Sequence, residues 1–345
     1  MSVYNYDTFS TNIYDNFSDN SLVKNWENYE NVWKDERGNG VVKDNSYIDF
    51  ININDTSDVK KKKCLVLKAN GDKYNLDKPI GLKNKKTQRV GGGVKSKDLM
   101  GPGEYKLRIK FSNEDSVCNA IWLFKYLEIE ADDIRHIKDE NYCLNNDIEK
   151  VNIINHEIDF ELLENNSCRC NIFKSTEGLY EENNIDLNLF DLKLNNNKWH
   201  DFKYIWETGY VKISELIGRD LKDEEVIRTQ EKCTIHNLKE KKYSKLNGLC
   251  VTKSIENDNN YCLIYGKKIE ISIDNKIILT REIKDISYNN IINNKIPHSL
   301  SHFYIALWFP KFIKKNPDFL QTMLYVDYFS YKYNGNPVDR MFNYP

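Results

Sequence analysis

The stretch Asn155-His156-Glu157-Ile158-Asp159-Phe160-Glu161-Leu162-Leu163 decides the fold class. Successive side chains of a β-strand point to opposite faces. In a strand the three apolar side chains of the central part would therefore share one face, and Glu157, Asp159 and Glu161 would line the other. In a helix, Glu157 and Glu161 would lie together while Asp159 pointed away from them. The regular alternation of apolar and acidic residues therefore predicts a strand with one buried face.

Three carboxylates on one strand face repel one another, so the pKa of at least one of them is expected to be raised. Folding does not require this arrangement, whereas glycoside hydrolysis requires two carboxyl groups flanking one bond. The Cα atoms of Glu157 and Glu161 would be about 13 Å apart at roughly 3.3 Å per residue. Both side chains can lean toward Asp159 and approach the roughly 5–5.5 Å of a retaining enzyme. The alternative is an acidic, solvent-facing strand in a chain with 52 Asp and Glu residues.

The composition of the 345-residue chain is typical of an all-β protein. It holds 22 Tyr and 15 Phe, and aromatic and β-branched residues pack well on pleated sheets. A series of short strands separated by turns predicts two packed antiparallel sheets. The 50 Lys and Arg residues nearly balance the 52 Asp and Glu residues. We therefore expect neither a nucleic acid nor a membrane as partner.

The eight cysteines and six histidines lack the spacing of a metal site, so no metal and no cofactor are expected. The longest apolar run, residues 303–309, is too short to span a bilayer. Residues 1–20 are polar and lack the basic and apolar regions of a secretory signal. The sequence thus predicts no signal peptide or transmembrane segment, an intracellular or virion-associated location, and cysteines that are free thiols.

Two segments interrupt the pattern of strands. Residues 128–152 are acidic and irregular, and residues 209–266 carry mixed charge with a possible helix at about residues 221–231. An independent domain would need a larger apolar core, so we expect insertions within one domain spanning residues 1–345. Gly91-Gly92-Gly93 predicts a turn where backbone approaches a ligand, and Asp274-Asn275 predicts the turn of a hairpin.

The order of several further motifs resembles glycoside hydrolase family 16, which includes laminarinases, lichenases and xyloglucan endotransglycosylases. The family signature is the Glu-x-Asp-x-Glu strand. The resemblance runs, with interruptions, from about Asp15 to Tyr333, through residues 93–97, 103–110, 120–123, 199–206, 271–276, 306–308 and 323–329. It implies a concanavalin A-like β-jelly-roll sandwich of two antiparallel sheets with loop insertions, and a groove across the concave sheet.

The resemblance also implies roles for individual residues. Glu157 would be the nucleophile, Glu161 the general acid/base, and Asp159 would tune the ionisation of both. The charges of Glu157 and Asp159 would then raise the pKa of Glu161. Sugars stack on aromatic rings, and for each tryptophan a place in the core is the alternative. Substrate contacts are expected from Lys95, Trp122, Asn171, Phe173, His200, Trp206 and Trp308.

Some positions differ from the family pattern. Phe173 stands where Tyr is usual, Gly93 and Lys95 stand where lichenase-like members place a Glu and an Arg, Ala306 replaces an Asn, and Asn155 lies where a Trp often precedes the nucleophile. The leading hypothesis is a retaining endo-glycoside hydrolase or transglycosylase that acts on a β-linked glucan-like polysaccharide. The competing hypothesis is a non-catalytic structural or glycan-binding jelly-roll protein, such as a component of a virus particle. The sequence does not indicate the linkage or the oligomeric state.

Overall fold

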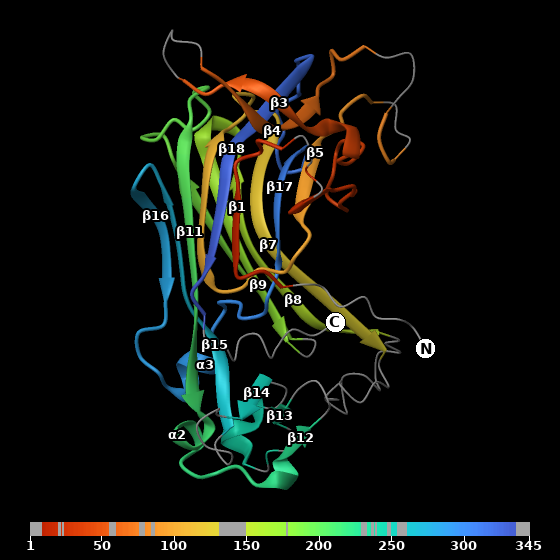
Figure 1. Cartoon of the computed structure of the whole chain (residues 1–345). Coiled ribbons are helices and arrows are strands. Elements are labelled where there is room, and N and C mark those ends of the chain that lie inside the picture. Colours follow the sequence, from red (N-terminus) through yellow and green to blue (C-terminus); the bar gives the residue numbers. More distant parts are fainter. Residues whose placement is uncertain are drawn as a thin grey trace.

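The computed structural model describes residues 9–19, 22, 24–54, 60–75, 80–83, 87–130, 150–176, 179–228, 233–235, 238, 240–246, 250–253 and 261–335. These residues form two antiparallel sheets that pack face to face (Figure 1). The predicted all-β sandwich is therefore confirmed. Within the described part of the chain, no helix is both long and apolar enough to cross a membrane.

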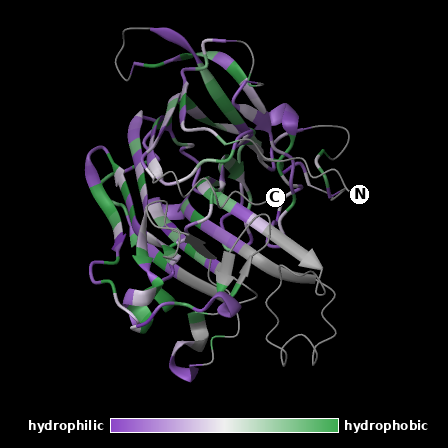
Figure 2. Ribbon diagram, turned by 60° about the horizontal axis from the view of Figure 1, so that its bottom comes forward, coloured by the Kyte–Doolittle hydropathy of each residue, from purple (hydrophilic) through white to green (hydrophobic). Residues whose placement is uncertain are grey.

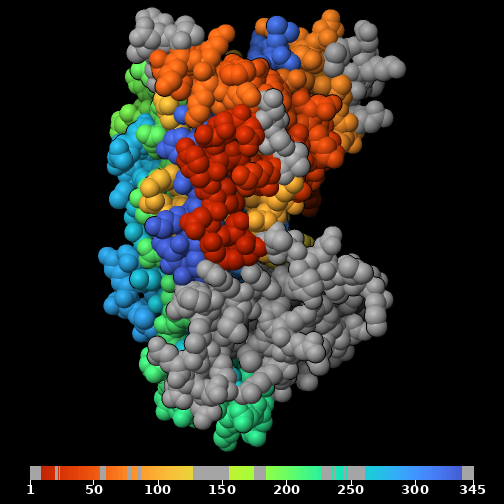
Figure 3. Space-filling view, in the orientation of Figure 1, coloured from red at the N-terminus to blue at the C-terminus, as the bar shows by residue number. Residues whose placement is uncertain are grey.

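The larger sheet has eleven strands in the order β12-β13-β14-β15-β11-β6-β18-β4-β3, with β1 paired to β18 and β16 paired to β15. The N-terminal strand β1 lies along the C-terminal strand β18 (Figures 1 and 3). The strands are β1 Asn12–Asp15, β3 Ser46–Asn52, β4 Lys61–Asn70, β6 Gly103–Lys110, β11 His200–Lys212, β12 Val226–Arg228, β13 Cys233–Ile235, β14 Cys250–Lys253, β15 Tyr261–Ile273, β16 Lys276–Glu282 and β18 Gln321–Tyr333.

The smaller sheet has seven strands in the order β10-β9-β8-β7-β17-β5-β2. The predicted acidic strand is β8, in the interior of this sheet between β7 and β9. The strands are β2 Trp26–Asn28, β5 Gly92–Ser96, β7 Cys118–Glu130, β8 Lys150–Leu162, β9 Ser167–Thr176, β10 Leu179–Asn188 and β17 His302–Trp308.

Alternating side chains of both sheets build the main core between them. On β8, Ile158, Phe160 and Leu162 point into this core and are at most 2% exposed. The ring of Phe160 lies 5.2 Å from that of Phe202 on β11, in the opposite sheet. Green and purple bands alternate along the strands in Figure 2. Burial of the apolar face fixes the strand register, since a slip of one residue would turn the carboxylates of β8 inward.

The hairpin predicted at Asp274-Asn275 is confirmed between β15 and β16. Asp274 and Asn275 have φ values of 51° and 63°, as expected for a two-residue turn with both central residues left-handed. The turn predicted at Gly91-Gly92-Gly93 is wrong, because β5 begins at Gly92. A Cβ on Gly91 would lie 1.9 Å from the carbonyl oxygen of Leu307, so close backbone packing accounts for this glycine.

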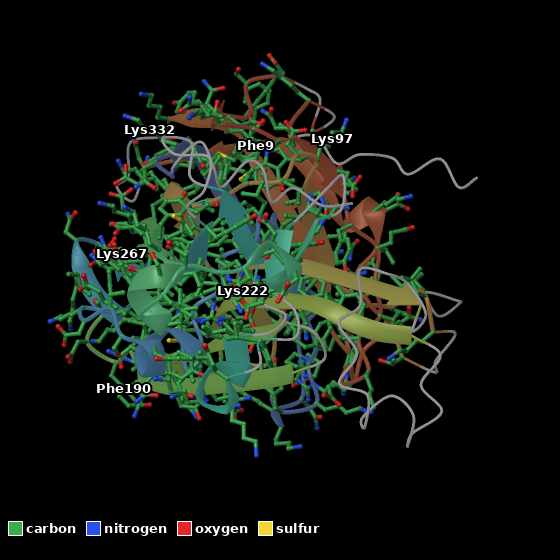
Figure 4. The ribbon with its side chains drawn as sticks, turned by 90° about the horizontal axis from the view of Figure 1, so that it is seen from below. Phe9, Lys97, Phe190, Lys222, Lys267 and Lys332 are labelled. Atoms are coloured by element: carbon green, nitrogen blue, oxygen red, sulfur yellow. The ribbon has the colours of Figure 1, made fainter. Side chains whose placement is uncertain are left out.

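The segment predicted as a second insertion extends the larger sheet. Strands β11 and β15 continue past the sandwich and meet β12–β14, which Figure 4 shows from below with Lys222 on this extension. A small apolar cluster holds the extension together, formed by Val211, Ile213, Ile217, Val226, Ile235, Leu238, Leu246, Tyr261, Leu263, Tyr265 and Ile291.

The helix predicted near residues 221–231 is wrong for the described residues. Residues Asp223–Glu225 form one 3₁₀ turn and β12 follows. Arg219 donates two hydrogen bonds to the buried Glu225 carboxylate, at 2.8 and 2.9 Å, and Val226 then packs in the small cluster as a strand residue. Short helices do occur at α2, Ile213–Ile217, and α3, Tyr288–Ile292.

The predicted first insertion is only partly described. Strand β7 extends to Glu130 and β8 begins at Lys150, so the ends of this segment are strand, while residues 131–149 lie outside the described part. Among the described residues, the free cysteines are Cys64, Cys118, Cys168, Cys170 and Cys262.

Candidate active site

The three carboxylates of β8 lie on the face of the seven-stranded sheet that points away from the main core. Glu157 is flanked by Phe124 of β7 and Phe173 of β9 in the strand register. Glu161 is flanked in the same way by Ala120 and Arg169. The predicted facing of the acidic strand is therefore confirmed, and the sheet supplies neighbours to each carboxylate from both sides.

The pKa of Asp159 is raised by its surroundings. This residue is 6% exposed, and burial raises its pKa well above the ordinary value, followed by the charges of Glu157 and Glu161. A hydrogen bond from Asn171 opposes this shift, whereas a hydrogen bond with Glu157 adds to it. The shift favours the protonated form of Asp159, in which the carboxyl group can donate a hydrogen bond to Glu157.

Glu161 is the second buried carboxyl group of this strand face. It is 7% exposed, and burial raises its pKa to about 7 against the opposing effects of Arg169 and of a hydrogen bond with Cys118. The Cys118 Sγ atom lies 3.8 Å from Glu161 Oε1. The other oxygen, Oε2, is buried and has no hydrogen-bond partner among the described residues. Such a group is costly for folding, and perturbed carboxyls of this kind gather at functional sites.

An aromatic cluster covers the sheet beside the carboxylates. Trp122 on β7 and Trp308 on β17 are each 8% exposed. Trp33, from the N-terminal segment, packs against both, with ring centroids 6.1 Å from Trp122 and 4.8 Å from Trp308. Trp122 also stacks on Tyr304 at 4.7 Å. Trp122 and Trp308, from which substrate contacts are expected, thus lie on this face and contact other aromatic rings.

Small residues form the cross-strand row of the sheet that includes Glu161. Ala120 and Ala306 pair across β7 and β17, and Gly93 of β5 pairs with Ala306 on its other side. Glu161 stands at one end of this row of small residues. The neighbouring row on one side carries Trp122, and the neighbouring row on the other side carries Trp308. Gly93 and Ala306, which differ from the family pattern, are thus part of this row of small residues.

No protein-family model matches the sequence, and no curated protein matches it. Solved structures do match over nearly the whole chain. A prokaryotic β-1,3-1,4-glucanase (lichenase) from a mouse hindgut metagenome superimposes with a TM-score of 0.50 at 10% identity, covering 94% of this chain and 99% of that one. LamAcat from Zobellia galactanivorans gives 0.51 at 12% identity, covering 95% and 98%. A Bacteroides ovatus mixed-linkage glucan family 16 protein in complex with a G4G4G3G product gives 0.51 at 13% identity, covering 92% and 99%.

The chain has the fold of glycoside hydrolase family 16. The concanavalin A-like jelly-roll expected from the sequence is thereby confirmed, and its seven-stranded sheet carries the acidic strand.

Three more of the predicted residues lie on the same face of this family 16 sheet. Asn171 forms the hydrogen bond with Asp159, and its Oδ1 atom is buried without a partner among the described residues. Phe173 lies beside Glu157 in the register. Lys95 shares a cross-strand row with Tyr304, Trp122 and Asp159. Its Nζ atom is 2.5 Å from Glu27 Oε1, so Lys95 marks the edge of the site.

The structure does not bring Trp206 and His200, from which substrate contacts are also expected, to this face. Both lie on β11 in the larger sheet. Trp206 is fully buried, and its Nε1 donates to the carbonyl of Pro297 at 2.9 Å. His200 is 4% exposed and lies 2.7 Å from Asp274 Oδ2. The sequence predicts that this face of β11 is buried. It does not show that β11 belongs to the larger sheet, opposite the sheet that carries the carboxylates.

Sequence reasoning missed Trp33 and Arg169. The surroundings of Trp33 in the sequence are polar, and Arg169 lies between two cysteines. Neither stretch has a periodicity that marks a site. Among the described residues, no group of three His, Cys, Asp or Glu side chains could hold a metal ion.

Proposed function

We propose that this protein is a retaining glycoside hydrolase or transglycosylase that acts on a β-linked glucan-like polysaccharide. One observation carries the proposal. The buried Glu161 carboxyl, with its pKa raised to about 7, shares a strand face with Glu157 four residues away. A carboxylic acid that titrates near neutral pH beside a second, partly exposed carboxylate is the pair that glycoside hydrolysis requires.

The proposed reaction uses the three carboxyl groups in different roles. Glu157 attacks the anomeric carbon while Glu161 donates its proton to the departing glycosidic oxygen. Glu161, now a carboxylate, then takes a proton from water or from a sugar hydroxyl, which attacks the same carbon and releases Glu157. Asp159, whose pKa is raised well above its ordinary value, donates a hydrogen bond from its protonated form to Glu157 and so orients the nucleophile.

The proposed substrate class rests on the fold and on the solved structures that share it. Lichenase and the Bacteroides ovatus protein with its bound glucan product act on or bind β-glucans by their descriptions. The partly exposed Trp33 supplies an aromatic ring beside the carboxylates, supported from below by Trp122 and Trp308. We therefore assign sugar stacking to Trp33.

A second candidate function is binding of glycans or partners without catalysis. The observation in its favour is that Glu161 and both sheet tryptophans are at most 8% exposed, so side chains must move before a sugar reaches Oε2. A non-catalytic protein would bind glycans without cleaving them.

The test is a screen of the purified protein over β-glucans, read by the release of reducing ends. Wild-type protein should release sugar, while Glu157→Gln should abolish release with an unchanged circular dichroism spectrum. Glu282→Gln, an exposed carboxylate on β16, is the matched control and should retain activity. Full activity of the Glu157→Gln protein would remove Glu157 as nucleophile. Binding without release by wild-type protein would favour the second candidate.

A further inference from the structure

Arg169 presents unused hydrogen-bond donors next to Glu161. It lies on β9 opposite Glu161 in the strand register, and its side chain is 30% exposed. Its Nε atom donates to Asp186 Oδ1 at 2.9 Å. Neither Nη atom has a hydrogen-bond partner among the residues that the structure describes. The guanidinium group beside Glu161 therefore uses its Nε–H donor within the protein. Its remaining N–H donors are available to a ligand.

The orientation of this fork is fixed by packing. The Arg169 Cζ atom lies 5.0 Å from the ring centroid of Phe312, and that ring lies 5.8 Å from the ring of Trp308. Cation–π stacking of this kind holds the plane of the guanidinium. The ion pair with Asp186 contributes little to this order, because the Asp186 side chain is 71% exposed and exposed pairs are weak.

Phe312 also bridges two strands that lie on either side of Glu161. Arg169 on β9 and Trp308 on β17 both contact Phe312, and β8 and β7 lie between those two strands. The contact therefore spans the sheet where Glu161 and Cys118 lie. Arg169 is the cross-strand neighbour of Glu161, so a sugar bound at Glu161 would lie next to its guanidinium group.

The chemistry of an oriented guanidinium fork selects planar or multidentate anions. Arg pairs with such groups through two parallel hydrogen bonds, which Lys cannot do. The loop that carries Phe312 adds exposed lysines. Lys314 has no carboxylate partner among the described residues, and its Nζ atom donates to the carbonyl of Lys311 at 2.8 Å. A neutral sugar would supply no charge to this region.

We propose that Arg169 binds an anionic substituent, a carboxylate or a sulfate ester, on the sugar next to the scissile bond, so that the preferred glucan-like substrate is acidic. This inference rests on the proposed function and deepens it by naming the substrate class.

The same contact would couple substrate charge to the acid/base. The positive charge of Arg169 lowers the pKa of Glu161 against the effect of burial. An anion bound to Arg169 offsets that charge, so Glu161 stays protonated to higher pH while an acidic substrate is bound. The basic limb of the kcat profile should therefore lie at higher pH for an acidic substrate than for a neutral one.

The experiment compares one β-glucan in three forms: unmodified, carboxylated at C6, and sulfated. Wild-type protein should have a higher kcat/KM on at least one acidic form. Arg169→Gln should lower kcat/KM on that form at least about tenfold more than on the neutral form, through KM, as expected for a lost charged hydrogen bond. Arg169→Gln should also remove the difference between the basic limbs of the kcat profiles measured with the acidic and the neutral substrate. Arg169→Lys should retain only part of the preference for the acidic form. The acidic form with the higher kcat/KM identifies the anion as a carboxylate or a sulfate ester.

Two further variants separate recognition from a structural role. Asp186→Asn removes the competing carboxylate and should keep or strengthen the acidic preference, whereas a structural ion pair would make it behave like Arg169→Gln. Arg281→Gln changes the net charge equally on β16 of the other sheet, is exposed, and should retain the preference. Equal activity of wild-type protein on acidic and neutral forms would overturn the proposal.

If no glucan is cleaved, the proposed function fails and binding decides the inference separately. Affinity electrophoresis in gels containing each glucan form then measures retardation of the wild-type, Arg169→Gln and Arg281→Gln proteins. Retardation by an acidic form that is lost only in Arg169→Gln supports an anion site. Equal retardation of all three proteins refutes it.

Discussion

Replacing Glu161 with glutamine is expected to stabilise the protein at alkaline pH and to leave its stability at acidic pH nearly unchanged. The pKa of Glu161 is raised from 4.5 to about 7 by burial. Because the folded-state pKa lies above the unfolded-state pKa, the folded state binds the proton more tightly. The stabilisation that protonated Glu161 contributes is therefore fully present below about pH 4.5 and is lost as the pH rises through about 7.

The size of the stability change follows from the size of the rise in the pKa of Glu161. At about 1.36 kcal/mol per pH unit, wild-type protein loses about 3 kcal/mol of unfolding free energy across the window. Glutamine is uncharged and similar in shape to the protonated carboxyl group, so the variant avoids this loss. The difference between Glu161→Gln and wild-type protein should thus be close to zero at pH 4.5 and about 3 kcal/mol at pH 8.

Urea denaturation at several pH values between 4.5 and 8 measures this difference. Glu224→Gln removes an exposed carboxylate and serves as control, with a difference from wild type that stays small throughout. A stability difference for Glu161→Gln that does not change with pH would refute the reasoning, because the carboxyl would then titrate alike in both states.

Further predictions concern the reaction and the packing. Proton NMR of the first-formed product should show retention through a glycosyl intermediate on Glu157, and an initially inverted anomer would exclude this route. The basic limb of kcat/KM on a neutral glucan should lie near pH 7, set by Glu161, and a rate still rising at pH 9 would contradict it. Trp33→Ala should shift tryptophan emission to the red by exposing the rings beneath, and an unchanged spectrum would argue against this packing. Asp327→Ala should cost about 2 kcal/mol in urea denaturation, because Asp327 is buried between Lys62 at 2.6 Å and Arg108 at 3.1 Å; an unaffected midpoint would show that these ion pairs contribute nothing.

Local patterns were sufficient to predict the sandwich and the acidic strand. The alternation along β8 reports directly which side chains face the core, and Asp274-Asn275 marks a turn by its own backbone preferences. Both signals depend on residues that are neighbours in the sequence. They therefore remain readable when nothing is known of the rest of the chain.

The parts that could not be predicted depend on contacts between distant segments. The alternation along β11 indicates a buried face for His200 and Trp206, but it does not say which sheet the strand joins. Trp33 contacts Trp308 across 275 positions of the sequence. Arg169 gains its setting from Phe312, which lies in a loop beyond β17.

The extension built on β11 and β15 has a consequence for how the chain unfolds. These two strands pair continuously, apart from one register shift between Glu207 and Thr208, from Phe202 beside the main core to Lys212 beside the small cluster. Separating the extension from the sandwich would break this ladder lengthwise, since no linker joins two bodies there. We infer that the small cluster and the main core melt in a single cooperative transition. A proteolytic cut within the extension would then leave a nicked chain whose halves stay hydrogen-bonded along the ladder.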